Sequence, residues 1–527
     1  MRASLVGDPA ERVSARILAE GTAQNATLLL LGLALARLII QFSGITHYGF
    51  FRDELYYMAC GEHLAWGYVD QPPLVAFVAW LARHAFGDSI VSIRLFPVLS
   101  GVAIVFFTGL FARELGGGRF AQFLAATAML FAPLFLAFHS FLSMNAFEPL
   151  FWLSCSWIAV RVVQGASPRL WLVFGAVAGI GLENKHTTLV FGFALIAGLL
   201  LSGKYRLFGS KWIWIGGLVA LALFLPNLIW EARNGWPQIE VVRNAQLYKN
   251  VHIGPLRFLG DQVLFLHPIA LPIWVGGLIW LFTAREGKRY RYLGWTYVIT
   301  VAIFVIFGGK SYYPLPAYPM LLAAGGVAFE SFVEVRERRW LKVAFPALLV
   351  VGGLVTVPFG VPLLPVETFL RYTQGIPIDR MAKTERGPTV ALPQLYADMF
   401  GWENMAAAIG RVYQSVPESE QAECAILAGN YGEAGAIDYY GRKLGLPRAI
   451  SGHNSYFYWG PRNYTGGCVI LFGERADEFK NFFGDVRRVA TISDPHAMLI
   501  EQGISVYLCR KPCAPLNVLW PRFKLII

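Results

Sequence analysis

Long apolar segments alternate with short polar ones over the first 360 residues of the chain. A helix crosses the hydrocarbon layer of a membrane in about 20 apolar residues, within a range of roughly 17 to 25. The two shortest apolar segments meet at the polar residues 183–186 and predict either two spans or one bent element. Counted separately, they bring the predicted membrane-spanning segments to eleven, which are 24–46, 92–113, 119–139, 146–163, 169–184, 187–202, 211–231, 257–282, 291–308, 314–332 and 340–360. The pattern predicts a polytopic α-helical membrane protein with about 11 transmembrane helices.

The basic residues between these segments predict which side of the membrane each loop faces, because Lys and Arg are retained on the cytoplasmic side. With residues 1–23 as a cytoplasmic tail, the inner segments hold 18 Lys and Arg, and the outer segments up to residue 360 hold 9 in a greater length. The membrane domain, 24–360, then has a first outer loop at 47–91. The other polar breaks of the outer face are 139–145, 184–186, 236–237 and 308–313.

A change of pattern after residue 360 predicts a second domain over 361–527. It opens with a linker-like stretch whose prolines are Pro362, Pro365, Pro377, Pro388 and Pro393. The apolar runs 423–429 and 468–473 are typical of strands, and helical patterns follow them, one through Tyr440 and one over 474–483. We expect a small α/β domain outside the membrane, on the periplasmic or extracellular side.

Four cysteines lie in this second domain: Cys424, Cys468, Cys509 and Cys513. An outer compartment permits disulfides, and Cys509 and Cys513 are close enough in sequence to suggest a tight loop. Cys60 and Cys155 are expected to be unpaired. The glycines of 429–435 match neither the dinucleotide nor the Walker spacing, so they predict a structural turn.

Composition agrees with a membrane protein, because 56% of the residues are hydrophobic and 15% are charged, against about 25% charged in an average soluble domain. The net charge of +11 could suggest a nucleic-acid partner. The basic residues follow the predicted topology instead, which argues against nucleic acid and leaves membrane lipids as the partner of the apolar surface.

The first outer loop places two acids, Asp53 and Glu54, side by side directly after the first apolar segment. Adjacent helical side chains point about 100° apart, so one acid can face a substrate while the other orients it or packs. A carboxylate among aromatic rings at a membrane surface loses solvation and suits a general base. The alternative is an ordinary helix start in the interface.

Aromatic and polar residues follow in the same loop. Trp66 and Tyr68, beside Asp70 and a Pro-Pro turn, could stack on a sugar or lie among lipid headgroups. In later outer loops, His186 could be a metal ligand or a base, but it has no partner three or four residues away, which favours an interfacial histidine. Asn145 and Glu148 are the polar residues of the second outer loop.

Two lysines, Lys185 and Lys310, lie at the outer ends of predicted helices. If they converge near Asp53 they form an anion site able to hold a phosphate; the alternative is that each reaches to the interface separately. Lys310 is followed by Tyr312, Tyr313 and three prolines, and irregular backbone at that depth lines cavities.

Three blocks of sequence resemble the bacterial glycosyltransferase family 39, which contains protein O-mannosyltransferase-like enzymes and the aminoarabinose transferases of lipid A. The blocks are 52–57, 66–74 and 310–319, and segments 430–436 and 451–456 also look like parts of the family. The resemblance implies a GT-C fold in a bacterial inner membrane. It also implies an inverting transfer of a sugar from a polyprenyl-phosphate carrier to an acceptor on the outer face.

Carried over by position, the resemblance assigns the base to Asp53 and a basic role to Lys310. Relatives often carry an aspartate where this chain has Asn145, and Glu148 follows one helical turn later. That departure weakens a mechanism with two carboxylates, including one that needs a divalent cation; no cofactor is required, and a divalent cation is left open.

The expected function is therefore an integral membrane glycosyltransferase with a polyprenyl-phosphate-linked sugar as donor and a lipid, glycan or protein as acceptor. The alternatives are a membrane transporter or lipid flippase, and a scaffold without catalysis. A transporter would need polar groups near the bilayer midplane or on both faces, whereas the polar groups here gather on one side.

Overall fold

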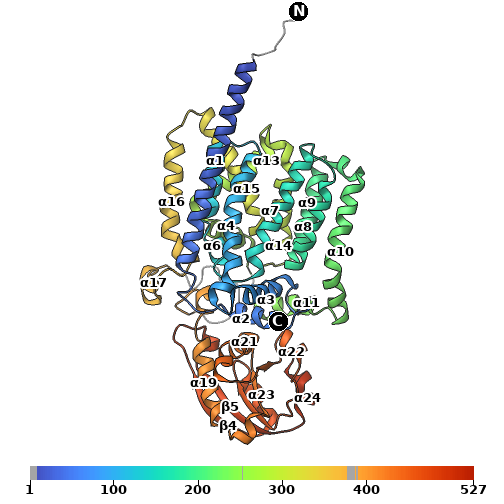
Figure 1. Cartoon of the computed structure of the whole chain (residues 1–527), viewed down its shortest axis with the longest axis vertical. Helices are drawn as coiled ribbons and strands as arrows, with labels where there is room; N and C mark the ends of the chain where they lie inside the picture. Colours follow the sequence, from blue (N-terminus) through green and yellow to red (C-terminus); the bar gives the residue numbers. More distant parts are fainter. Residues whose placement is uncertain (1–8, 252, 377–385, 387–389) are drawn as a thin grey trace, which may run out of the picture.

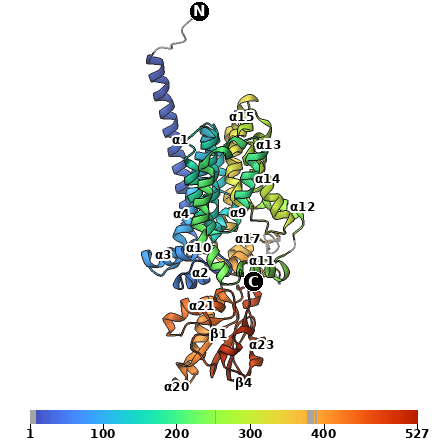
Figure 2. The same ribbon diagram turned by 90° about the vertical axis from the view of Figure 1, so that its right-hand side faces the viewer.

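The apolar segments form a bundle of long helices, and a domain with a sheet lies against one end of it (Figure 1). This computed structural model describes residues 9–251, 253–376, 386 and 390–527. The predicted prolines Pro377 and Pro388 and the first eight residues of the predicted tail lie outside the described residues. Three short helices lie between the bundle and the domain: α2 (Arg52–Glu62), α3 (Leu74–Phe86) and α11 (Pro237–Asn244) (Figure 2).

Each of the eleven predicted segments coincides with one helix or with two consecutive ones. The bundle helices are α1 (Pro9–Ser43), α4 (Ile90–Glu114), α5 (Arg119–Leu130), α6 (Pro133–Phe138), α7 (Met144–Val163), α8 (Leu170–Asn184), α9 (Thr187–Leu201), α10 (Lys211–Arg233), α12 (Pro255–Phe265), α13 (Leu271–Thr283), α14 (Arg291–Ile306), α15 (Tyr318–Val335) and α16 (Leu341–Gly360). The segments 169–184 and 187–202 are two separate helices.

Length and composition identify fewer certain spans than the sequence pattern predicts. Within the described part of the chain, six helices are long and apolar enough to cross a membrane, and the pair α12 and α13, bent by 98°, makes a seventh. Helices α8 and α9 are apolar but shorter. The chain is a multi-pass helical membrane protein, and the count of eleven stays a prediction.

The break between α5 and α6 explains the buried Arg37. Pro133 begins α6 and cannot continue the helix before it, so carbonyl groups near the break lose their helical partners. Arg37 of α1 donates to the carbonyls of Leu130 and Phe135, both at 2.8 Å. The arginine therefore binds one backbone carbonyl on each side of the break inside the bundle.

The second domain contains a five-stranded mixed sheet in the order β2-β1-β3-β5-β4. Its strands are β1 (Cys424–Ala428), β2 (Ile450–Ser451), β3 (Cys468–Phe472), β4 (Phe483–Ile492) and β5 (Ile504–Pro512). β1 runs parallel to β2 and β3, and β5 runs antiparallel to β3 and β4. Helices of this part are α17 (Val366–Tyr372), α18 (Gln394–Ala397), α19 (Trp402–Ser415), α20 (Glu418–Gln421), α21 (Tyr431–Tyr440), α22 (Ser455–Trp459), α23 (Ala476–Phe479) and α24 (Leu516–Leu519).

The predicted strand over 423–429, the helix after it and the strand over 468–473 are confirmed as β1, α21 and β3. The predicted helix over 474–483 is confirmed over 476–482, where α23 continues as a 3-10 helix over Lys480–Phe482, and Phe483 begins β4.

The disulfide joins Cys424 to Cys468, which lie directly opposite each other on the parallel neighbours β1 and β3. The suggested loop between Cys509 and Cys513 is wrong. Cys509 lies in β5 and Cys513 follows the end of that strand, and both are free. Cys60 and Cys155 are free and buried, as expected.

The sheet domain shares a hydrophobic core with α2 and α3. Leu55 and Ala76 of these helices belong to the same buried cluster as Ile426 of β1 and Ile437 of α21. Helix α21 lies so close to α2 that a Cβ atom on Gly435 would come within 2.9 Å of the Leu55 carbonyl carbon. The glycines predicted to form a turn thus allow two helices to approach, and the domain is fixed to the end of the bundle.

The unpaired cysteines provide a test of orientation. Among the described cysteines outside the disulfide, Cys513 is exposed and the other three are buried. If the sheet domain lies outside the cytoplasm, a membrane-impermeant maleimide added to intact spheroplasts will label the chain at Cys513. Cys513→Ser is the control and should abolish labelling, while labelling only after membrane lysis would contradict the predicted orientation.

Candidate active site

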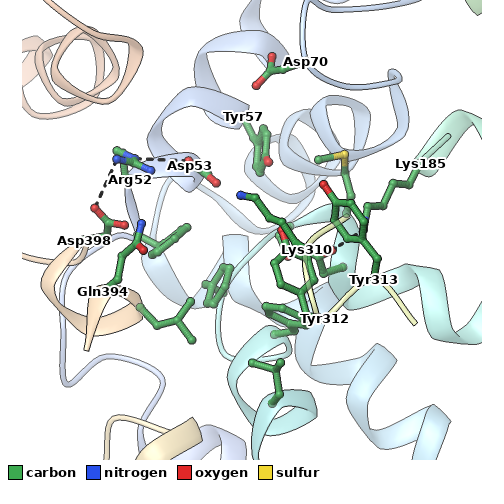
Figure 3. Close-up of a pocket in the computed structure, with 18 of the residues that line it drawn as sticks. Arg52, Asp53, Tyr57, Asp70, Lys185, Lys310, Tyr312, Tyr313, Gln394 and Asp398 are labelled. Carbon is green, nitrogen blue, oxygen red and sulfur yellow. Dashed lines mark hydrogen bonds and ion pairs between the residues drawn. The ribbon is translucent and has the colours of Figure 1, made fainter. Parts of the chain in front are cut away.

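A cavity of about 430 Å³ lies where the end of the bundle, α2 and the sheet domain meet (Figure 3). Its apolar wall includes Leu134, Phe138 and Phe265, which come from α6 and α12. The predicted outer loops 47–91, 139–145, 184–186 and 308–313 all contribute side chains to it. Its main polar lining residues are Arg52, Asp53, Asp70, Asn145, Lys185, His186, Lys310, Tyr312, Tyr313, Gln394 and Asp398.

Asp53 lies in the first turn of α2, where the helix dipole favours a negative charge. Its Oδ1 accepts a hydrogen bond of 2.9 Å from the Tyr431 hydroxyl, and the Arg52 Nε lies 3.7 Å from the same oxygen. The side chain is 29% exposed. The Asp53 carboxylate is therefore fixed by Tyr431 and Arg52 and is still accessible from the cavity.

Arg52 connects Asp53 to the start of the sheet domain. Its guanidinium lies 3.7 Å from Asp398 Oδ1 and 5.7 Å from the centre of the Tyr431 ring. Its backbone N–H donates to the Asp398 carbonyl at 3.0 Å. These contacts fix the first residue of α2 against the segment that leads into the domain (Figure 3).

Asp70 brings a second carboxylate into the cavity. Tyr56 donates to its Oδ1 at 2.8 Å, and the Tyr56 hydroxyl also contacts the Ser455 hydroxyl at 2.7 Å. Burial raises the pKa of Asp70 to about 6, and the nearby charge of Asp53 adds to the rise. The first outer loop alone thus supplies two carboxylates to the cavity.

Lys185 is fixed at the opposite wall by hydrogen bonds to Asn145 Oδ1 at 2.8 Å and to Glu148 Oε2 at 2.9 Å. Glu148 is 2% exposed and also accepts a hydrogen bond from the Thr187 hydroxyl. The ammonium group lies 4.8 Å from the centre of the Tyr313 ring. Glu148 therefore pairs with Lys185 and does not itself line the cavity.

Lys310 belongs to the irregular segment between α14 and α15. Its ammonium group lies 5.9 Å from the Tyr312 ring centre, and its side chain extends into the cavity on the side of Asp53 and Tyr57 (Figure 3). The two lysines thus line one cavity together with Asp53. Such an arrangement can abstract a proton at one wall and stabilise an anion at the other.

No group of three or more His, Cys, Asp or Glu side chains that could hold a metal ion occurs within the described ranges.

Residues 70–230 match the family model described as dolichyl-phosphate-mannose-protein mannosyltransferase. The fold is similar to that of ArnT from Cupriavidus metallidurans bound to undecaprenyl phosphate, with a TM-score of 0.61 and 14% identity, covering 90% of this chain and 97% of ArnT. ArnT in the apo state gives a TM-score of 0.58 at 15% identity, covering 92% and 98%. No curated protein matches the sequence.

The chain has the GT-C fold of ArnT, and its residues 70–230 match the mannosyltransferase family model. The expected GT-C fold, with its multi-pass bundle and sheet-containing domain, is confirmed. The family segment begins at Asp70 and ends at Trp230, so it includes Lys185 but neither Asp53 nor Lys310.

Several residues that the sequence proposed for the site do not line the cavity. Glu54 is fully buried and pairs with Arg94 at 2.8 Å. Trp66 is 62% exposed on the outside, and Tyr68 is buried with its hydroxyl donating to the Cys60 carbonyl at 2.9 Å. His186 does line the cavity, with its Nε2 at 3.0 Å from Asn227 Oδ1.

Sequence reasoning missed the residues that the sheet domain contributes, among them Tyr431, Ser455 and Asp398. Segments 430–436 and 451–456 resembled parts of the family, which was the available signal, but nothing local connected them with a loop almost 400 residues earlier. Their role depends on the contact of α21 with α2.

The environment of Glu54 predicts a structural role that separates it from Asp53. Glu54 also accepts hydrogen bonds from the backbone N–H groups of Leu142 and Phe51, both at 2.8 Å. Glu54→Gln leaves the buried Arg94 charge without its counter-ion, so we expect the protein to lose about 3–5 kcal/mol of stability. Thermal unfolding in detergent measures this, and an unfolding temperature equal to that of the wild type would contradict the role.

Proposed function

We propose that this glycosyltransferase transfers a sugar from a polyprenyl-phosphate carrier to a hydroxyl or amine of a cell-envelope acceptor at the outer face of the bacterial inner membrane. The observation that carries the proposal is that Asp53, Lys185 and Lys310 line one cavity at one end of the bundle. Polar groups at a single end favour transfer at the membrane surface over transport through it.

Asp53 is assigned the general base. Its carboxylate takes the proton of the acceptor hydroxyl or amine while the acceptor atom forms a bond to the anomeric carbon of the sugar. The bond between that carbon and the phosphate oxygen breaks, and its electron pair leaves with the phosphate. A single displacement of this kind inverts the configuration at the anomeric carbon.

The two lysines are assigned to the departing polyprenyl phosphate, whose negative charge increases as the bond breaks. Lys185 is held in place by Asn145 and Glu148, so its ammonium needs no rearrangement to meet that charge. The apolar wall, including Leu134 and Phe265, suits the first isoprene units of the carrier. The binding of undecaprenyl phosphate by ArnT, to which this fold is similar, supports the same carrier class.

The acceptor belongs to the cell envelope, and lipid A, another glycan, a lipid or a protein would each present the nucleophile that Asp53 requires. Comparison of the envelope lipids, glycans and secreted proteins of a deletion strain by mass spectrometry identifies the missing sugar. A strain that lacks no sugar would overturn the proposed function.

Asp53→Asn tests the base, because the amide has the same shape and cannot take the proton. We expect sugar transfer to fall at least about 100-fold, with thermal stability close to that of the wild type. The measurement is the rate of product formation on membrane vesicles from the deletion strain, which supply donor and acceptor. Asp477→Asn, on the exposed surface of the sheet domain, is the matched control and should keep full activity.

Wild-type turnover by Asp53→Asn would remove Asp53 from the mechanism. It would leave the polyprenyl-phosphate donor to be judged separately, by the binding experiment on Lys310.

Lys310→Ala tests the phosphate site. Loss of a charged hydrogen-bond donor is worth about 1.5–3 kcal/mol, so we expect undecaprenyl phosphate to bind roughly 10- to 100-fold more weakly. Native mass spectrometry of the detergent-purified chain, titrated with undecaprenyl phosphate, gives the dissociation constant. Lys443→Ala, an exposed lysine outside the cavity, should bind as the wild type does, and equal binding by both variants would contradict the assignment.

A further inference from the structure

The sheet domain reaches into the active site through Tyr431. The Tyr431 hydroxyl donates to Asp53 Oδ1 at 2.9 Å, across 378 positions of sequence. The tyrosine is 6% exposed, so the phenol is shielded from water where it meets the carboxylate. A hydrogen bond from a neutral donor to a carboxylate strengthens when bulk water is excluded.

The backbone position of Tyr431 is fixed by the strand before it and by the cap of its helix. β1 ends at Ala428, and Asn430 then caps α21: its side chain accepts from the Glu433 N–H, and its own N–H donates to Glu433 Oε2, both at 3.0 Å. Tyr431 is the first residue of that helix. Its position is therefore set by the end of β1 and the capped start of α21, and not by a long loop.

The ring of Tyr431 is held on several sides as well. Its centre lies 4.7 Å from the Tyr56 ring and 4.7 Å from the His453 ring, and the Arg52 guanidinium lies 5.7 Å from it. The backbone cannot withdraw without opening the contact of α21 with α2, because a Cβ on Gly432 would lie 2.5 Å from Arg52 Cγ. The phenol thus has one orientation, which points at Asp53.

We propose that Tyr431 is a positioning residue for the base, so that the sheet domain completes the active site of this enzyme. This inference rests on the proposed function, in which Asp53 takes the acceptor proton. Tyr431 and Arg52 both contact Oδ1, so Oδ2 is the oxygen that receives the proton. The phenol fixes the plane of the carboxylate and gives it a hydrogen bond that favours its charged form.

Ser455 makes a parallel connection on the neighbouring acid. Its hydroxyl contacts Tyr56, which donates to Asp70, and it accepts from the Val69 N–H at 3.2 Å. Two residues of the sheet domain therefore support the two carboxylates of the first outer loop. A domain that only bound a separate partner would not need either contact.

Tyr431→Phe is the direct test, since it removes the hydroxyl and keeps the ring. On membrane vesicles from the deletion strain we expect the rate of sugar transfer to fall roughly 10-fold or more at neutral pH, mainly in kcat. The acid limb of the pH profile should move to higher pH, because the carboxylate loses a hydrogen bond that favours its charged form. The deficit should therefore grow as the pH falls.

Tyr458→Phe is the matched control. Its hydroxyl donates to the Asn234 carbonyl at 3.2 Å, so it also joins the sheet domain to the bundle but does not touch either acid. We expect this variant to keep the wild-type rate and pH profile. Replacement of Tyr431 by 3-fluorotyrosine, a stronger donor of the same shape, should move the acid limb to lower pH and provides a second variant if the phenylalanine form is unstable.

The outcomes separate the two proposals. A wild-type chain that transfers no sugar to the vesicles overturns the proposed function itself. If the wild type is active and Asp53→Asn is not, a Tyr431→Phe variant with the rate and pH profile of Tyr458→Phe overturns the role of Tyr431. A loss of the same factor at every pH, with no displacement of the acid limb by 3-fluorotyrosine, also overturns it, because that is the effect of altered packing alone.

Discussion

The buried ion pair of Glu54 with Arg94 holds the end of the bundle on which the candidate active site is built. Arg94 projects from α4 and donates to Glu54 and to the carbonyls of Ile45 and Gly49 at 2.7–2.8 Å, while Glu54 also accepts from the Leu142 N–H. One pair therefore ties α4, the chain after α1, the start of α2 and the segment before α7. Both side chains are fully buried, so the pair is costly to form unless all its hydrogen bonds are satisfied. Asp53 precedes Glu54 in α2, so the ion pair also fixes the position of Asp53 at the cavity.

The same constraint explains why the sheet domain is not a separate module. Helices α2 and α3 expose apolar side chains away from the bundle, and the sheet domain covers them with its own core. Charged residues reinforce the edge of this contact, where Glu62 of α2 pairs with Arg83 of α3 at 2.7 Å and also with Arg442 of the sheet domain. Because the domain and the bundle bury a common core, side chains from both can meet in the cavity with defined geometry.

Charge in the cavity is arranged differently from what the family resemblance suggested. Asn145 stands where an aspartate was expected, and it binds Lys185 instead of serving as an acid. Glu148 neutralises the same lysine from behind. The first outer loop supplies a further acid, Asp70, whose pKa is raised to about 6 by burial. The cavity is thus lined by the carboxylates of Asp53, Asp70 and Asp398 and by both lysines, with no acid at position 145.

The sequence by itself determined the apolar segments and the gathering of the polar loops at one end. It also determined the strands β1 and β3 and the candidate residues Asp53, Lys185 and Lys310. Those features follow from local periodicity and from the distribution of charge, which are properties of neighbouring residues. Only the tertiary structure decided that Asp53 faces the cavity while Glu54 is buried, that Cys424 pairs with Cys468, and that Tyr431 reaches Asp53. A helical period separates two adjacent side chains by angle but does not say which neighbour each one meets, and strand order and domain contact are set by residues hundreds of positions apart.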